Sequence, residues 1–409
     1  MHILFLTDNF PPEGNAPATR TFEHTREWVK QGHKVTVITC SPNFPEGKVF
    51  DGYQNKWLSK ERIEGVDVWR VKTYITANEG FVKRTLDFVS FMFNSFLFGL
   101  FSKKVDVVVG TSPQFFTVIS AWALAKLKRV PFIFELRDIW PASITAVGAM
   151  KKSKVITLLE KIEMFLYSQA DSIISVTHSF KKELIERGIE GSKIDVVLNG
   201  VDLSKYQPAE NKAPEFAKQF GLEGKFVAGY IGTHGLAHAL DKIVDAAALL
   251  EHDDDIRIVF AGGGADRPRI EKLVAERSLK NIVMIPRQPK EKMPELWSLC
   301  DVSLVHLKDI PLFTTVIPSK IFESMGMGLP IVISVPKGES SEIIDESEVG
   351  IVTPPENPEA LALVIKQLKG DCFLLRKLRL NSLNAAKRYN RGTLALDMLD
   401  IIERRVKFN

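Results

Sequence analysis

Residues 318–332 combine side chains that suit the binding of a nucleotide. Pro318 and Ser319 are typical of the first positions of a helix, where free backbone N–H groups attract a phosphate, and Lys320 adds a positive charge. Glu323 follows about one turn later, where its carboxylate can accept hydrogen bonds from the two hydroxyl groups of a ribose. The alternative is an ordinary turn between a helix and a strand.

A second segment, residues 228–250, passes from an apolar strand through a glycine-bracketed turn into an amphipathic helix. We expect Gly235 to let the backbone approach an anion closely, and His234 to donate a hydrogen bond to a phosphate. The turn lacks both the full GxGxxG spacing of a dinucleotide site and the lysine of a P-loop. A turn without a ligand is therefore the alternative.

A third segment, residues 5–39, reads as a strand, a loop rich in Pro and Gly, a helix and a second strand. This order defines a βαβ unit and predicts a parallel sheet. Ligands of open α/β sheets bind at the carboxyl ends of the strands, which is where Glu13, Gly14, Asn15 and Arg20 fall. A stiff connector without a ligand is the alternative here.

Taken with the run NGVD at residues 199–202, these segments resemble the family 4 glycosyltransferases of the GT-B fold. The resemblance covers essentially the whole chain. It extends to bacterial O-antigen and capsule transferases, including a group of fucosamine transferases with similar DNFPPE and ELRDIWP runs. It implies an α/β protein of two Rossmann-like, doubly wound domains that face a central cleft.

Alternating strands and helices indicate two domains of this kind in the sequence itself. We expect an acceptor-binding domain at residues 1–204 and a nucleotide-sugar-binding domain at residues 205–386. The resemblance implies that a last helix, residues 387–409, returns to the first domain. The two halves are similar in architecture but show no internal sequence repeat.

The resemblance also assigns roles to residues, with Asp138 and Glu323 expected nearest to the chemistry. Thr315 stands where the family usually has the first of two glutamates, and the usual Arg and Lys pair after the first strand of the second domain is absent; Arg287 is a candidate replacement. No DxD sequence lies in a plausible donor loop, so we expect no metal ion and no cofactor. The expected donor-binding residues are Gly14, Asn15, Asn199, His234, Gly235, Arg287, Thr315, Pro318, Ser319, Lys320 and Glu323, and the expected acceptor-side residues are Glu13, Arg20 and Arg137.

Composition fits a globular protein of 409 residues with 45% apolar and 25% charged residues. The three cysteines are isolated, which favours a reducing compartment, and the chain shows no signal-peptide pattern. Residues 1–204 hold 26 Lys or Arg against 22 Asp or Glu, so the net charge of +4 lies in this half. We expect the protein to be cytoplasmic.

Residues 85–104 are rich in Phe and have Lys or Arg on both sides. The segment is too short and too polar for a membrane span, but it could lie in the membrane interface with its basic flanks near anionic headgroups. Phe91 and Phe96 are expected to face the lipid. The alternative is a buried helix, and residues 151–167 pose the same choice between a surface helix and a membrane contact.

The resemblance implies a glycosyltransferase that moves a sugar from a UDP-sugar to a polyprenyl-diphosphate-linked saccharide in O-antigen or capsule biosynthesis. N-acetyl-L-fucosamine is the preferred donor sugar, and the family implies retention of stereochemistry without a metal. The expected location is peripheral, on the cytoplasmic face of the inner membrane, with no nucleic-acid partner. Two alternatives stay open: a UDP-sugar 2-epimerase of the same fold, and a non-catalytic subunit of a membrane assembly.

Overall fold

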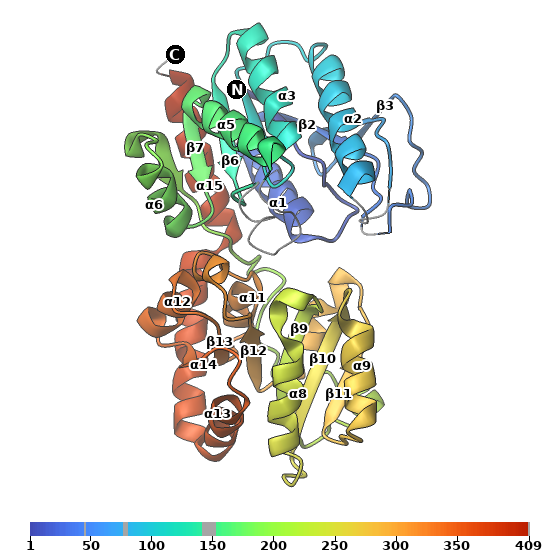
Figure 1. The fold of residues 1–409 in the computed structure, drawn as a ribbon, viewed down its shortest axis with the longest axis vertical. Coiled ribbons are helices and arrows are strands. Elements are labelled where there is room, and N and C mark those ends of the chain that lie inside the picture. Colours follow the sequence, from blue (N-terminus) through green and yellow to red (C-terminus); the bar gives the residue numbers. More distant parts are fainter. Residues whose placement is uncertain (45, 77–80, 141–152, 408–409) are drawn as a thin grey trace. The chain divides into compact units, whose positions relative to one another are not determined.

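The computed structural model describes residues 1–409 except 45, 77–80, 141–152 and 408–409. The chain forms two compact units: residues 1–199 together with 391–409, and residues 200–390. We call them unit 1 and unit 2. Each unit is an α/β layer structure built on one sheet (Figure 1). The second unit therefore begins within the NGVD run, directly after Asn199.

The sheet of unit 1 has eight strands in the order β3-β4-β2-β1-β5-β6-β7-β8. All neighbours are parallel except β3 and β4, which form an antiparallel hairpin at one edge. This hairpin was not anticipated from the sequence. The strands are β1 (His2–Leu6), β2 (Lys34–Cys40), β3 (Leu58–Ile63), β4 (Val66–Val71), β5 (Val107–Thr111), β6 (Phe132–Leu136), β7 (Ser172–Ser175) and β8 (Ile194–Val196).

Helices cover both faces of this sheet, because the central strands are apolar on both sides. One core packs against α2, α3 and α5, and a second core packs against α1 and α15 (Figure 1). The helices of the unit are α1 (Ala16–Lys30), α2 (Phe81–Gly99), α3 (Phe115–Lys128), α5 (Lys154–Gln169), α6 (His178–Glu186) and α15 (Arg391–Lys407). The last helix thus packs on the first one, although they lie at opposite ends of the sequence.

Unit 2 has a six-stranded, fully parallel sheet in the order β11-β10-β9-β12-β13-β14. The strands are β9 (Phe226–Thr233), β10 (Ile256–Gly263), β11 (Ile282–Ile285), β12 (Val302–His306), β13 (Ile331–Ser334) and β14 (Gly350–Thr353). The helices are α7 (Pro214–Gln219), α8 (Leu240–Leu249), α9 (Arg267–Glu276), α10 (Met293–Ser298), α11 (Lys320–Gly326), α12 (Glu339–Ser347), α13 (Pro358–Gly370) and α14 (Cys372–Ala386).

Two helix starts differ from the expectation. Helix α11 begins at Lys320, so Ser319 is its N-cap residue and Pro318 precedes it. Helix α8 does not follow the glycine turn directly, because a short 3-10 helix, Leu236–His238, lies between them. No helix in the described part of the chain is long and apolar enough to cross a membrane.

Candidate functional site

Four side chains gather at the carboxyl ends of β9 and β12 in unit 2, and we call them the Lys320 cluster: Tyr230, His234, His238 and Lys320. The Lys320 ammonium lies 3.4 Å from the centre of the Tyr230 ring. The ring centres of His234 and His238 lie 5.8 and 5.9 Å from the same ring. A buried lysine held by a ring and not by a carboxylate has its charge available for another anion.

Lys320 is 8% exposed, and its Nζ has no hydrogen-bond partner among the described residues. Burial lowers the pKa of Lys320 to about 7, and the charge of Glu323 opposes this shift. A lysine with three donors and no acceptor beside it is costly to bury. An ammonium without a partner at this edge is free to pair with an anionic ligand.

The two histidines of the cluster are neutral near pH 7. Burial lowers the pKa of His234 to about 4, with the charges of Arg267 and Lys320 adding to the effect. The pKa of His238 is also lowered to about 4, again mainly by burial. The ring nitrogens of the fully buried His234 have no partner in the described chain. A neutral imidazole still has one N–H to donate to a phosphate oxygen.

Glycines bring the ends of β9 and β10 unusually close together beside this cluster. A Cβ on Gly262 would lie 2.0 Å from the carbonyl oxygen of Gly232, and one on Gly264 would lie 2.4 Å from that of His234. Gly235, in contrast, has an ordinary φ of −110° and room for a side chain. Gly262 and Gly264 thus permit a close approach between the two strand ends, whereas the expected approach of an anion to Gly235 stays a prediction.

Glu323 is half-buried on α11 and is held by a residue that the sequence did not point to. The indole Nε1 of the fully buried Trp297, on α10, donates to Glu323 Oε2 over 3.2 Å. A charge-assisted hydrogen bond of this kind fixes the direction of a carboxylate. In the sequence, Trp297 reads only as a large apolar residue of a short helix.

The other residues of unit 2 that are expected to bind the sugar donor lie near this edge and make few contacts. Thr315 follows a 3-10 turn, and its hydroxyl donates to the carbonyl of Leu312 over 3.0 Å. Pro318 and Ser319 are half-buried just before α11. Arg287 is exposed beyond the end of β11, with its Cβ near Gly263.

In unit 1, Glu13 lies in the loop after β1 and is 4% exposed. Its Oε1 accepts hydrogen bonds from the backbone N–H groups of Asn43 and Phe44, at 2.8 and 3.0 Å. Burial raises the pKa of Glu13 to about 7, and the two hydrogen bonds oppose this shift. Glu13 therefore anchors the loop after β2 to the loop after β1.

Arg20, expected on the acceptor side, is 2% exposed and ties several elements together. Its Nε donates to Glu135 over 2.8 Å, and its two NH groups donate to the carbonyls of Val197 and Leu198 and to Asn199 Oδ1. We therefore correct its role: the guanidinium positions Glu135 and the end of unit 1. Asn199, expected to bind the donor, is the recipient of one of these bonds.

Asn15 is the N-cap of α1, since its Oδ1 accepts from the N–H of Ala18 over 2.9 Å. Its amide also donates to Asn9 over 2.6 Å. The neighbouring Gly14 is exposed, and no atom lies within 4 Å of the position of a Cβ. The space around Gly14 thus leaves room for a ligand, whereas Asn15 serves the helix.

Asp138 and Arg137 follow β6 at the same edge of the sheet. Both backbone N–H groups donate to the hydroxyl of Ser112, at 3.2 and 2.8 Å, so this corner is fixed from the end of β5. Burial lowers the pKa of Arg137 to about 10. Pro141, the last residue of the FELRDIWP run, lies outside the described residues.

Sequence reasoning missed two carboxylates next to this edge. Burial raises the pKa of Asp8, directly after β1, and raises that of Asp87, on α2, to about 7. The charges of Asp8 and Glu13 contribute to the shift of Asp87. Only the position of Asp8 at a strand end could have indicated this group.

Helix α2 is amphipathic, and its inner face corrects one expectation. Phe91 is 1% exposed in the core of unit 1, and Phe96 packs against that core. Phe91 therefore cannot face a lipid, and Phe96 is only partly exposed. The outward apolar side chains on α2, α3 and α5, which lie on one face of the sheet (Figure 1), are Leu86, Phe93, Leu97, Leu127, Val155, Leu158 and Phe165.

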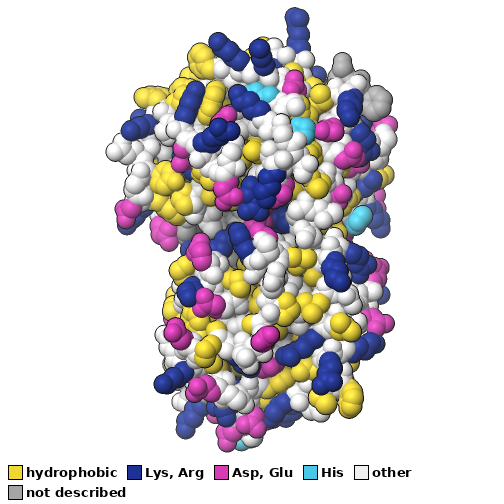
Figure 2. Space-filling view, turned by 180° about the vertical axis from the view of Figure 1, so that it is seen from behind, with side chains coloured by type: hydrophobic (Ala, Val, Ile, Leu, Met, Phe, Trp, Pro, Cys, Tyr) yellow, Lys and Arg dark blue, Asp and Glu magenta, His cyan; other side chains and the backbone are white. Residues whose placement is uncertain are grey.

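Basic residues lie on these three helices or shortly after them in the sequence, and none of them pairs with a carboxylate in the described ranges. They are Lys83, Arg84, Lys103, Lys104, Lys126, Arg129, Lys154 and Lys161, all exposed. We call the apolar side chains and these cations the α2–α3–α5 face. On the side seen in Figure 2, basic and acidic side chains are instead interspersed.

Comparison with known proteins agrees with this geometry. The model described as Glycosyltransferase Family 4 matches residues 18–205, and the model described as Glycosyl transferases group 1 matches residues 212–388. Together they cover most of the chain. The chain therefore belongs to the family 4 glycosyltransferases of the GT-B fold, and it is an enzyme of that class.

Among its relatives, a protein of Escherichia coli named as the colanic acid biosynthesis glycosyl transferase WcaI is 27% identical over 90% of this chain and 92% of its own. The glycosyltransferase WbjE of Pseudomonas aeruginosa is 26% identical over 68% and 70% of the two chains. Sucrose-phosphate synthase of Thermosynechococcus elongatus has a TM-score of 0.79 at 16% identity, covering both chains completely. HepE of Anabaena, solved with UDP and glucose, has a TM-score of 0.73 at 15% identity and covers 98% and 99%. These two structures show the shared fold.

Proposed function

We propose that this glycosyltransferase transfers a sugar from a UDP-sugar to a polyprenyl-diphosphate-linked saccharide during assembly of a bacterial surface polysaccharide. N-acetyl-L-fucosamine is the donor sugar we test first. The relative named for colanic acid biosynthesis supports the class of pathway, and the neighbour solved with UDP supports the class of donor. The single observation that carries the proposal is the buried, unpartnered ammonium of Lys320 at the strand ends of unit 2.

Loss of UDP from a sugar leaves a diphosphate whose charge must be neutralised as the bond to the anomeric carbon breaks. Lys320 and an N–H of His234 are suited to this task, and they replace the Arg and Lys pair that the family usually carries. Such protein groups can neutralise the diphosphate without a metal ion. We therefore propose that turnover is independent of divalent cations.

Glu323 is suited to hold the ribose of the donor. Trp297 occupies Oε2, and a carboxylate has further acceptor sites for two hydroxyl groups. Thr315 replaces the other glutamate of the family, so the sugar ring loses one carboxylate contact in this protein. We propose that this loss suits a deoxy sugar, which has one hydroxyl group fewer to bind.

In unit 1, Asp138 is the residue we place nearest to the acceptor hydroxyl. In a retaining front-face displacement, the acceptor oxygen bonds to the anomeric carbon on the side that UDP leaves, and the leaving phosphate oxygen takes the acceptor proton. No separate general base is then required. Asp138 would orient the sugar or the hydroxyl, while its corner is fixed by Ser112.

The α2–α3–α5 face supports a peripheral location on the cytoplasmic side of the inner membrane, where a polyprenyl-linked acceptor resides. Side chains such as Phe93, 63% exposed, can enter the acyl boundary while the bordering cations meet anionic headgroups. Each Lys or Arg near such a surface contributes about 1 kcal/mol. The face therefore offers both contributions that peripheral binding requires, apolar burial and electrostatic attraction to anionic lipid.

The test is the turnover of a panel of UDP-sugars, followed by mass spectrometry with a synthetic polyprenyl-diphosphate N-acetylglucosamine acceptor and a chelator present. We expect one donor to add its residue mass to the lipid and UDP to be released. Epimerised UDP-sugar without any acceptor product would instead indicate a 2-epimerase. UDP binding without turnover of any donor would favour a non-catalytic subunit.

A further inference from the structure

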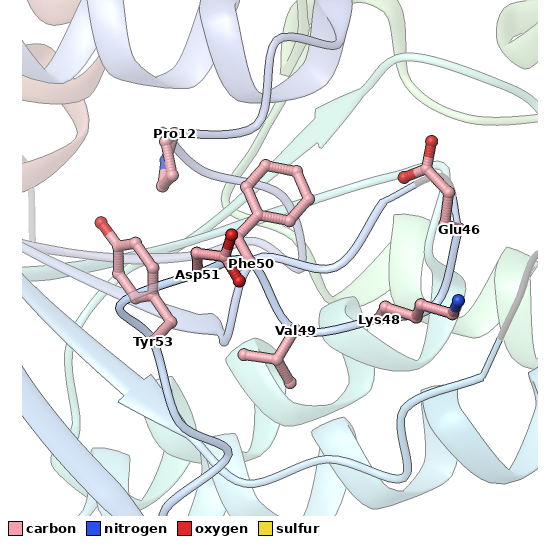
Figure 3. A pocket seen from close by; sticks show the side chains of 7 residues that line it. All are labelled: Pro12, Glu46, Lys48, Val49, Phe50, Asp51 and Tyr53. Carbon is pink, nitrogen blue, oxygen red and sulfur yellow. The ribbon is translucent and has the colours of Figure 1, made fainter.

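The loop between β2 and β3 forms an open pocket with the loop after β1, and no role has been given to it above. Its volume is about 700 Å³, within the range of small-ligand sites. Figure 3 shows side chains from both loops around it. The lining residues are Pro12, Glu46, Lys48, Val49, Phe50, Asp51 and Tyr53.

The pocket adjoins the strand edge at which unit 1 is expected to bind its acceptor. Pro12 directly precedes Glu13, and Glu13 fixes the start of the β2–β3 loop through the N–H groups of Asn43 and Phe44. In open α/β sheets this edge is where ligands bind. The pocket therefore lies beside the carboxyl strand ends at which unit 1 is expected to bind its acceptor.

One buried side chain, Arg70, contacts residues in or next to two walls of the pocket. The guanidinium of Arg70, 2% exposed, lies 4.9 Å from the centre of the Tyr53 ring. It also donates to the carbonyls of Pro11 and of Cys40, and it pairs with Glu61. One buried cation thus fixes both the Tyr53 wall and the Pro12 wall, which reduces the ordering cost of binding.

The polar groups of the pocket are uncommitted and nearly balanced in charge. The carboxylates of Glu46 and Asp51, the ammonium of Lys48 and the hydroxyl of Tyr53 make no hydrogen bond or ion pair with any described residue. Two carboxylates and one ammonium do not suit a phosphate, which needs an excess of donors or of positive charge. They do suit hydroxyl groups, which both donate and accept hydrogen bonds.

Aromatic and apolar surface completes the chemistry. Phe50 and Tyr53 lie on the same stretch of loop, with Val49 beside them (Figure 3). A sugar ring has apolar C–H faces and a polar rim, so it matches a site in which rings and carboxylates alternate.

We propose that this pocket binds a neutral sugar ring of the acceptor saccharide, next to the ring that receives the transferred sugar. The inference rests on the proposed function in one respect, that unit 1 binds a saccharide acceptor. Phe50 and Tyr53 contact the ring faces, and Asp51 accepts hydrogen bonds from its hydroxyl groups. The pocket thereby selects the length and identity of the acceptor, whereas the donor site does not depend on it.

The experiment measures binding of methyl glycosides of glucose, galactose and N-acetylglucosamine to the full chain by saturation-transfer NMR, with UDP present. We compare wild type with the double variant Phe50→Ala/Asp51→Asn. Phe373→Ala is the matched control, because Phe373 is 81% exposed in unit 2. Thermal unfolding of all three proteins shows whether the variants fold.

We expect at least one glycoside to bind wild type and the control, and its affinity for the double variant to fall about tenfold or more. Equal binding by the double variant, or no binding of any glycoside to wild type, overturns the inference. If the double variant does not fold, Asp51→Asn alone provides the comparison. UDP affinity measured in parallel should not change. Failure of wild type to bind UDP would contradict the proposed donor site, whereas glycoside binding tests the saccharide site of unit 1 separately.

Discussion

The carboxyl strand edges of the two units solve different recognition problems. In unit 2, Lys320 and His234 are buried with donors left unsatisfied, and Trp297 directs Glu323. In unit 1, Arg20 and Glu13 are buried and hydrogen-bond to the protein's own backbone, although Glu13 Oε2 has no partner among the described residues. The first pattern suits one compact, highly charged ligand. The second builds a rigid frame around open surfaces that suit a larger, neutral ligand.

The largest effect is expected on the free energy of unfolding, from a substitution among the buried charged groups of unit 1. Changing Arg20→Met leaves the buried Glu135 without its closest cation and should lower the free energy of unfolding by about 3 to 5 kcal/mol. Denaturant unfolding measures this change. Arg62→Met is the control, since Arg62 is 71% exposed and lies 3.7 Å from Asp67. A loss below 1 kcal/mol for Arg20→Met would contradict the framing role.

In unit 2, the corresponding change should affect binding and not folding. Lys320→Met should weaken UDP about hundredfold, or about 2.7 kcal/mol, because the diphosphate loses its buried cation. Stability should stay equal or rise, since an unpaired buried charge is removed. Calorimetric titration and thermal unfolding measure both. Lys242→Met, on α8 beside its partner Asp245, is the control and should leave UDP affinity unchanged.

The pH dependence of UDP binding tests the same lysine without a mutation. The pKa of Lys320 is lowered to about 7 in the free protein, so the charged form declines above pH 7 while bound diphosphate favours it. UDP affinity should therefore fall by up to tenfold per pH unit above pH 7. Stability without ligand should rise over the same range, because the unfolded chain keeps its proton to higher pH.

The Lys320→Met variant controls the pH experiment. Its UDP affinity should vary little between pH 7 and 9, because His234 and His238, with pKa values lowered to about 4, stay neutral there. A pH slope that persists in the variant would assign the titration to another group. The lysine would then have no special part in binding.

Glu323→Gln should have a smaller effect on UDP, about tenfold, since the amide keeps one acceptor for the ribose hydroxyl groups. The comparison with 2′-deoxy-UDP sharpens this prediction. Wild type should prefer UDP over the deoxy compound, and the variant should lose most of that preference. Unchanged UDP affinity in the variant would remove Glu323 from the ribose site, and Trp297→Phe would then also be expected to have no effect.

Local sequence patterns predicted the parts of the fold that they determine. The apolar runs of β1, β9 and β13 predicted buried parallel strands. His234 was expected in the donor site from its place in the turn after a strand, and Lys320 from its place at a helix start; both roles stay predictions. The β3–β4 hairpin was missed, because its alternation is short and its edge position depends on tertiary pairing. Trp297 was missed for a related reason: its indole N–H is always a donor, but only the folded structure brings it to the carboxylate of Glu323.

Arg20 and Phe91 are two residues whose burial was not predicted from the sequence. Arg20 was expected to bind the acceptor from its place near a strand end, and Phe91 was expected to face lipid from the Phe-rich segment with basic flanks around it. Both are buried by contacts between elements distant in sequence. A cation near a strand end can either bind a ligand or hydrogen-bond to neighbouring parts of the protein. Periodicity could not decide which Phe of α2 faces inward, because Phe residues occur on both of its faces.

The smallest effect is expected on membrane binding, where many weak contacts add up. Phe93→Ser should reduce binding to vesicles containing phosphatidylglycerol about fivefold, near 1 kcal/mol, because one exposed ring loses part of its transfer energy. Phe373→Ser, which changes an even more exposed ring of unit 2, should have no effect. Phe91→Ser should destabilise the fold instead, by about 3 kcal/mol. Equal losses for Phe93→Ser and Phe373→Ser would mean that the α2–α3–α5 face has no special affinity for lipid, and its cations would then be read as serving solubility alone.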